Sequence, residues 1–127
     1  MSVFSSGSFE ARVIPQPSGV VEVVYGGVAT DKTFSELSEV VVKETRRYGA
    51  LVIRMEAVVM ALSDVPTPPT YTKSMPPAAV VCSESHVVLW DAYGKEVSRM
   101  GVMRAVFSSS QLDLARLWAL RQIRARL

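Results

Sequence analysis

The chain has 127 residues, of which 49% are hydrophobic and 20% charged, a composition that is typical of a globular protein and excludes a disordered one. Fourteen Lys and Arg against twelve Asp and Glu leave a net charge of +2, which gives no support to nucleic-acid binding. The longest apolar run, residues 57–62, is far shorter than the roughly 20 residues of a membrane span. We therefore predict a single domain over residues 1–127 that binds no nucleic acid and does not span a membrane.

The single cysteine and the N-terminal residues indicate the compartment. Cys82 has no second cysteine with which to form a disulfide. The first six residues lack the charged start and apolar core of a signal peptide. We therefore expect a cytoplasmic location.

The N-terminal part of the chain predicts two paired strands. Apolar and charged residues alternate over residues 9–13, which is the period of a half-buried strand. Two prolines and a glycine in residues 15–19 form a turn signal, and the Val-rich residues 20–25 follow. We expect these two strands to form a hairpin.

A helix and a buried strand are predicted next. Thr33 and Glu36 have the spacing of a capping box, in which each side chain bonds a free N–H of the first helical turn. Gly49 is the expected C-terminal stop. Residues 50–55 are apolar except for Arg54, which is the near-continuous apolar character of a strand covered on both faces. Residues 57–62 are also apolar, but their pattern does not distinguish a strand from a helix.

A proline-rich segment interrupts this alternation of elements. Five of the seven prolines lie between Pro66 and Pro77. Because proline lacks a backbone N–H and restricts the residue before it, neither a helix nor a central strand can run through this segment. The sequence therefore predicts a loop over residues 63–77.

After the loop, the apolar residues 78–82 predict another buried strand. Ser83 or Ser85 could then cap a helix that extends to residue 97. Residues 91–95 would alternatively suit the turn of a β-hairpin. We favour the helix, because a strand, a helix and a strand continue the alternation of the first half.

The last two elements are a strand and a helix. Gly101 ends the preceding helix, and residues 102–107 form the strand. Ser110 and Asp113 have the spacing of a second cap, which predicts the start of a C-terminal helix. The element order predicts an α/β fold: a single mixed sheet of about five strands with helices mainly on one face.

Three segments carry a resemblance to a known family: residues 23–27 before the first helix, the central strand 50–55, and residues 106–118, in which a strand leads into a helix. With the element order, they resemble the STAS domain, the fold of bacterial anti-sigma-factor antagonists, which is related at the superfamily level to lipid-binding Sec14-like domains. The resemblance covers nearly the whole chain. It implies a non-enzymatic regulatory or interaction domain that binds a protein partner. That partner could be a second copy of the chain, in a homodimer.

The family places a phosphorylated serine after the strand that follows the first helix, in an Asp-Ser-Ser-Gly-like turn. Here that position holds Ser63 and Asp64 in inverted order, and no glycine follows before the prolines. A phosphate acts strongly where it meets a helix N-terminus, but no helix is predicted directly downstream. We expect Ser63 to be a solvated turn residue, with a phosphoacceptor as the alternative.

Few residues suggest chemistry. Ser83, Ser85 and His86 follow a buried strand, where ligands of α/β sheets tend to bind, so they are the candidate ligand-binding residues. Cys82 and His86 are four residues apart, but a cysteine that closes an apolar strand is most simply a buried one. No catalytic residue, metal or cofactor is indicated.

Two functions from different classes therefore stay open. The first is an interaction domain, which predicts an exposed apolar patch and no cavity larger than a few waters. The second is a domain that binds a small apolar ligand or lipid under the 63–77 loop, which predicts a cavity of ~300 Å³ or more.

Overall fold

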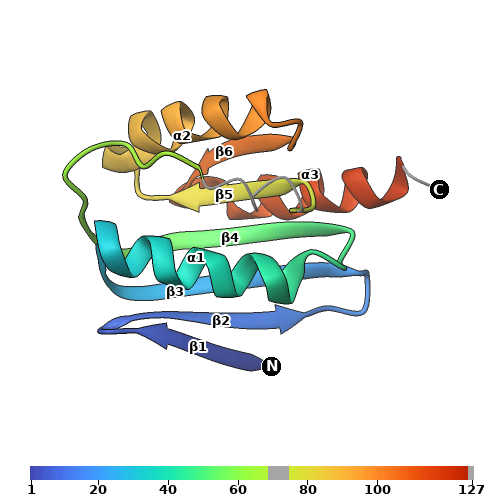
Figure 1. Cartoon of the computed structure of the whole chain (residues 1–127). Helices are drawn as coiled ribbons and strands as arrows, with labels where there is room; N and C mark the ends of the chain where they lie inside the picture. Colours follow the sequence, from blue (N-terminus) through green and yellow to red (C-terminus); the bar gives the residue numbers. More distant parts are fainter. Residues whose placement is uncertain (69–74, 126–127) are drawn as a thin grey trace.

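The computed structural model describes residues 1–68 and 75–125. Its elements follow the chain (Figure 1) as β1 (Ser2–Ser6), β2 (Phe9–Pro15), β3 (Val20–Thr30), α1 (Asp31–Thr45), β4 (Ala50–Ala61), β5 (Ala78–Cys82), the 3₁₀ turn η2 (Glu84–His86), α2 (Val87–Arg99), β6 (Arg104–Ser108), the 3₁₀ turn η3 (Ser109–Gln111) and α3 (Leu112–Arg124).

The strands form one mixed sheet whose spatial order, β1-β2-β3-β4-β5-β6, is the order of the chain. β1, β2 and β3 pair antiparallel, and β3 to β6 pair parallel. The predicted α/β fold with a single mixed sheet is confirmed. The described sheet has six strands, because the serine-rich residues before the first predicted strand form the edge strand β1, in which Phe4 lies opposite Ala11.

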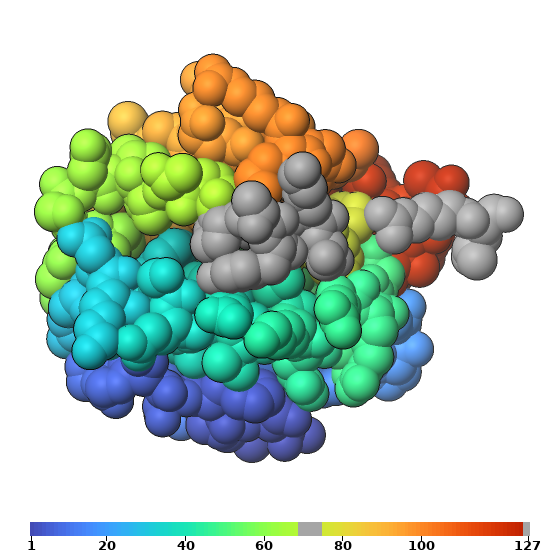
Figure 2. Space-filling model, viewed as in Figure 1, coloured from blue at the N-terminus to red at the C-terminus, as the bar shows by residue number. Residues whose placement is uncertain are grey.

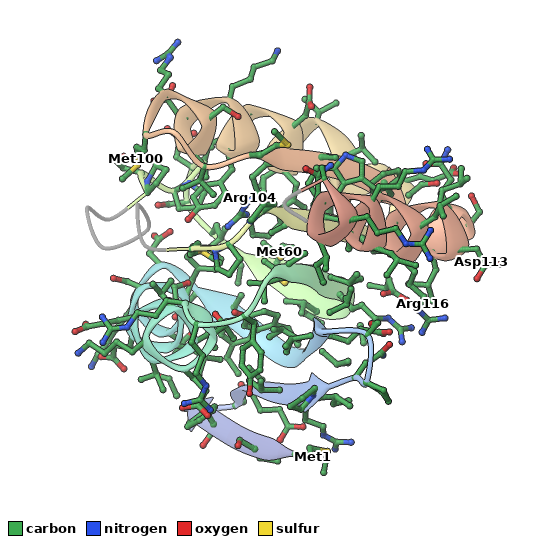
Figure 3. The ribbon with its side chains drawn as sticks, turned by 90° about the vertical axis from the view of Figure 1, so that its right-hand side faces the viewer. Met1, Met60, Met100, Arg104, Asp113 and Arg116 are labelled. Atoms are coloured by element: carbon green, nitrogen blue, oxygen red, sulfur yellow. The ribbon has the colours of Figure 1, made fainter. Side chains whose placement is uncertain are left out.

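Two of the described helices lie on one face of the sheet and the third lies on the other. α1 and α2 pack on one face through a core that includes Phe34, Leu37, Trp90 and Val97. α3 packs on the other face, over a second core that is built around Ala115 and its neighbours Val20, Ala50, Val52, Ala79, Val81 and Ala119. The prediction of helices mainly on one face agrees with this arrangement (Figure 3).

The start of α1 differs from the prediction by three residues. Thr30 is the N-cap, and its N–H donates to Thr33 Oγ1 at 2.9 Å while the N–H of Thr33 donates to Thr30 Oγ1 at 3.2 Å. The predicted Thr33 and Glu36 box is therefore wrong. The reason is tertiary: β3 pairs with β4 as far as Thr30, so the helix can begin only where that pairing ends.

The ambiguous apolar residues after the central strand belong to β4, which extends to Ala61. They pair with the end of β3, beyond a bulge between Val24 and Gly26. Gly27 has φ +87°, and a Cβ there would collide with the carbonyl of Ser8. This close approach and the left-handed backbone require glycine.

Two further helix starts are decided by the structure. The helix after β5 is confirmed against the hairpin alternative. Before α3, the N–H of Ser108 donates to Gln111 Oε1 at 3.1 Å, so the capping box lies at these two residues and not at Ser110 and Asp113. Among the described residues, no helix is long and apolar enough to cross a membrane.

Candidate functional site

The predicted ligand residues lie together after β5. Ser83 Oγ lies 2.9 Å from His86 Nδ1 and 3.3 Å from Ser85 Oγ. Neither serine caps a helix: the N-cap positions of η2 and α2 make no side-chain capping bond. The three side chains instead form a hydrogen-bonded turn, and their use as a ligand site stays a prediction.

Ser63 lies just after β4 and is tied to the start of α1. Its hydroxyl donates to Asp31 Oδ2 at 2.6 Å, and its N–H donates to Oδ1 of the same carboxylate at 3.2 Å. Asp31 is the first residue of α1. A phosphate on Ser63 would therefore meet a carboxylate as well as the positive end of a helix dipole, two opposing effects.

Cys82 is a buried thiol. Its side chain has no exposed surface, and Sγ lies 3.8 Å from the carbonyl oxygen of Phe107. Burial, with a smaller contribution from the charge of Glu56, raises the pKa of Cys82 to about 11. The thiol is therefore protonated at neutral pH and is a poor nucleophile. Among the described residues, no group of three or more His, Cys, Asp and Glu side chains is placed to hold a metal.

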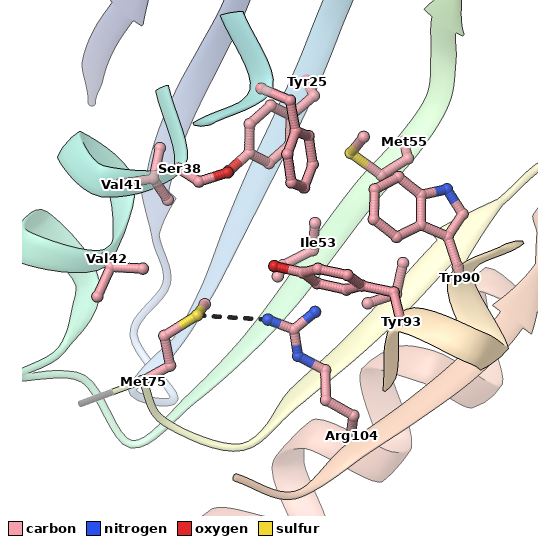
Figure 4. Close-up of a pocket in the computed structure, with 12 residues that line it drawn as sticks. Tyr25, Ser38, Val41, Val42, Ile53, Met55, Met75, Trp90, Tyr93 and Arg104 are labelled. Carbon is pink, nitrogen blue, oxygen red and sulfur yellow. Dashed lines mark hydrogen bonds between the residues drawn. The ribbon is translucent and has the colours of Figure 1, made fainter. Parts of the chain in front are cut away.

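A small cleft lies between α1 and α2, over β4 and β5. Its free volume is about 30 Å³. Phe34, Trp90 and Tyr93 form one wall, with ring centroids 5.5 to 5.8 Å apart. Met75, at the end of the β4–β5 connection, closes the opposite side (Figure 4). Residues 62–68 of that connection lie between α1 and α2 on the surface (Figure 2).

Arg104, the first residue of β6, points its guanidinium into this cleft. One terminal nitrogen donates to Met75 Sδ at 3.3 Å, and the guanidinium carbon lies 5.7 Å from the centroid of the Tyr93 ring. Nε is buried and has no hydrogen-bond partner within the described part of the chain. Burial lowers the pKa of Arg104. Trp90 Nε1 is also buried without a partner there, but it points away from Arg104 (Figure 4).

The sequence offered one signal for Arg104 that our prediction did not use. Arg104 lies in the strand predicted at residues 102–107, at a position whose neighbours two residues along the chain, Val102 and Val106, are apolar. Alternate residues of a strand share a face, so the pattern places a charge on an apolar face. The sequence does not say which side chains surround that charge.

The outer side of β6 forms a second surface of interest. β6 is the last strand of the described sheet and pairs only with β5. An open groove of about 490 Å³ runs between β6 and α2, and its α2 side includes Asp91, Lys95 and Arg99. The other residues of β6, Ala105 to Ser108, carry no charge, and the Arg104 side chain borders both this groove and the cleft into which its guanidinium points.

The face of the sheet under α3 holds an ionic cluster. Glu22 is only 4% exposed. Arg116 donates to both of its carboxylate oxygens, at 3.0 and 3.1 Å, and Gln16 donates to one at 2.6 Å. Arg54 lies 3.8 Å away and donates to Glu56 at 2.9 and 3.0 Å. Each charged side chain of the cluster has a partner of opposite charge, so we assign the cluster a role in stabilising the fold.

Comparison with known proteins finds no matching family model, no matching curated protein and no matching solved structure. The STAS-like relation therefore stays a prediction.

Proposed function

We propose that this chain is a non-enzymatic STAS-like interaction domain that pairs with a second copy of itself through the outer edge of β6. The observation that carries the proposal is the β6 edge, which pairs on one side only within the described sheet and has a single charged residue, Arg104, whose guanidinium points into the α1–α2 cleft. Exposed edges in natural sheets are usually protected by charged side chains, so an unprotected one is suited to pairing with another strand.

The groove beside β6 supports a two-fold partner. Asp91 lies towards the N-terminal end of α2, whereas Lys95 and Arg99 lie towards its C-terminal end. Two strands that pair antiparallel about a two-fold axis bring the adjoining helices together antiparallel. Asp91 of one copy would then lie near the basic residues of the other, so the surface is complementary to itself.

Apolar surface next to the edge would be buried by the same pairing. Met103, immediately before β6, is 54% exposed. Ala105, Val106 and Phe107 are half-buried in the isolated chain. Burial of apolar surface contributes roughly 25 cal/mol per Å², which is the main favourable term in association.

We also propose a cytoplasmic location for the domain. There the buried thiol of Cys82 would stay reduced, as expected for a chain with a single cysteine.

Charge reversal on α2 tests the pairing without disturbing the core. Asp91→Arg and Arg99→Asp each turn attraction into repulsion at both symmetric contacts, whereas the double variant exchanges the charges and restores attraction. An exposed ion pair contributes about 0.2–1 kcal/mol, so two reversed contacts should weaken the dimer about tenfold. Analytical ultracentrifugation measures the dissociation constant.

The control is Lys43→Glu on α1, an exposed residue paired with Glu39 at 3.2 Å, which should leave the dissociation constant unchanged. A wild-type chain that stays monomeric up to its solubility limit would overturn the proposal. So would a double variant that associates no better than the two single variants.

A role in binding a small ligand is the second candidate. The α1–α2 cleft, of about 30 Å³, is far below the ~300 Å³ expected for a ligand site, whereas a partly open hollow lined by Asp31, Phe34, Ser35, Pro66 and Thr67 measures about 270 Å³. The buried Nε–H of Arg104, which has no partner among the described residues, is the separate observation that favours a ligand.

A further inference from the structure

We propose that the cleft between α1 and α2 binds the carboxylate of a small apolar acid, with Arg104 as its counter-ion. Arg104 is the first residue of β6 and also borders the groove beside that strand, but the evidence for this site is separate: it is the buried Nε–H, which has no partner among the described residues.

Arg104 carries a charge that its surroundings do not neutralise. No carboxylate within the described residues forms an ion pair with it. The groups that act on its charge are Tyr93 and Tyr25, and burial raises the pKa of Tyr93, so that phenol stays neutral. A buried charge without a partner is costly. A ligand that supplies the negative charge would remove this cost.

The β4–β5 connection contains one acidic residue, Asp64, whose carboxylate accepts from the N–H of Val65 at 2.7 Å and forms no ion pair with Arg104. After Asp64, the next acidic residue in the chain is Glu84, beyond β5. Met75, the residue of this connection that does reach the guanidinium, offers a thioether, which is a weak acceptor.

The geometry of Arg104 suits a carboxylate. A carboxylate pairs side-on with a guanidinium by accepting from Nε–H and from one terminal N–H. Among the described residues, the Nε–H has no partner, and one terminal nitrogen donates to Met75, whose flexible side chain can be displaced. The free volume of about 30 Å³ has room for a carboxylate head group, so the apolar remainder would lie against other lining side chains such as Val42 and Phe34.

A phosphate fits the site less well. It carries nearly two negative charges and needs several donors. Among the described lining residues, Arg104 carries the one positive charge; the other donors are the hydroxyls of Ser38, Tyr25 and Tyr93 and the indole N–H of Trp90, on otherwise aliphatic and aromatic walls. One positive charge in an apolar cleft matches a monoanion with an apolar body.

Calorimetric titration of the wild-type chain separates charge recognition from apolar contact. The probes are hexanoate, hexanol and inorganic phosphate. Hexanoate should bind at least about tenfold more tightly than hexanol, because a charge-assisted pair is worth more than the ~1.4 kcal/mol of a tenfold difference. Phosphate should not displace hexanoate. Equal binding of hexanoate and hexanol, or displacement by phosphate, would overturn the proposal.

Two variants assign the effect to one residue. Arg104→Met keeps an unbranched side chain about as long as the aliphatic part of arginine and removes the charge, so hexanoate should bind at least about tenfold more weakly while hexanol is unaffected. Arg121→Met, an exposed residue of α3 on the other face of the sheet, is the control and should bind as the wild type does. Unchanged hexanoate binding by Arg104→Met would refute the site. Because the wild-type comparison needs no variant, a poorly folded Arg104→Met would leave the test intact.

Discussion

Removal of Arg116 should destabilise the fold, because it leaves the carboxylate of Glu22 buried with a weaker set of partners. Arg116 provides two of the three short hydrogen bonds to Glu22, at 3.0 and 3.1 Å. In Arg116→Met the remaining contacts are Gln16 at 2.6 Å and Arg54 at 3.8 Å. The substitution keeps the apolar part of the side chain, so the lost charge is the main change.

The size of the effect follows from the exposure of the two partners. Breaking a fully buried ion pair costs about 3–5 kcal/mol. The Arg116 side chain is 44% exposed, and Arg54 still neutralises part of the charge, so solvent screening reduces the expected loss to about 2 kcal/mol. In Glu22→Gln the arginine can turn to solvent, so the loss should be about 1 kcal/mol.

Urea denaturation measures both variants and their combination. The double variant Glu22→Gln with Arg116→Met contains no unpaired buried carboxylate, so it should be more stable than Arg116→Met alone. The control Arg12→Met removes an exposed pair, Arg12 and Glu10 at 3.3 Å, and should cost at most about 0.5 kcal/mol. The reasoning is wrong if Arg116→Met costs no more than this control, or if the two losses simply add.

Three further predictions concern the ends of the parallel strands. Iodoacetamide should label Cys82 at neutral pH only after unfolding, and rapid labelling of the native chain would contradict this. The free energy of unfolding should fall as the pH rises from 9.0 to about 11, because the raised pKa of Cys82 favours the protonated thiol in the folded state. Ser63→Asp should destabilise more than Ser63→Ala, by about 1 kcal/mol in low salt, because the new carboxylate faces Asp31; phosphopeptide mapping after incubation with lysate and ATP should find Ser63 unmodified, and a phosphate there would restore the phosphoacceptor alternative. In NMR spectra of the ¹⁵N-labelled chain, added sulfate should shift the amide resonances of residues 83–86 if this turn is the predicted ligand site. Unchanged resonances would rule out anion binding there.

The pattern of apolar residues was sufficient to predict most elements. Residues 78–82 are continuously apolar and residues 50–55 are apolar except for Arg54, and both lie in strands with helices on both sides of the sheet. The alternation over residues 9–13 predicted the strand β2. These features follow from the two-residue period of a strand, which neighbours along the chain already define.

The elements that were missed depend on partners far away in the sequence. β1 has five residues, and three of them are serines, so little in its sequence indicates a strand. It is a strand because β2 offers it a free edge. The start of α1 moved from Thr33 to Thr30 for a similar reason, since the pairing of β3 with β4 sets where the strand ends.

The functional residues divide in the same way. Ser83, Ser85 and His86 are within four residues of one another, so their proximity could be predicted from the sequence. The contact of Ser63 with Asp31 joins residues 32 positions apart, and only the tertiary structure shows it.

The sequence alone determined the alternation of strands and helices and the break after β4, because periodicity and proline act through neighbouring residues. Of the loop predicted over residues 63–77, residues 63–68 and 75–77 form neither helix nor strand, and residues 69–74 lie outside the described residues. The tertiary structure alone decided the environment of Arg104. Its charge lies in a cleft formed by α1, α2 and the end of the β4–β5 connection, elements that are brought together only when the sheet is assembled. Whether a charge is buried and whether it has a partner depend on every side chain around it, and those neighbours come from distant parts of the chain.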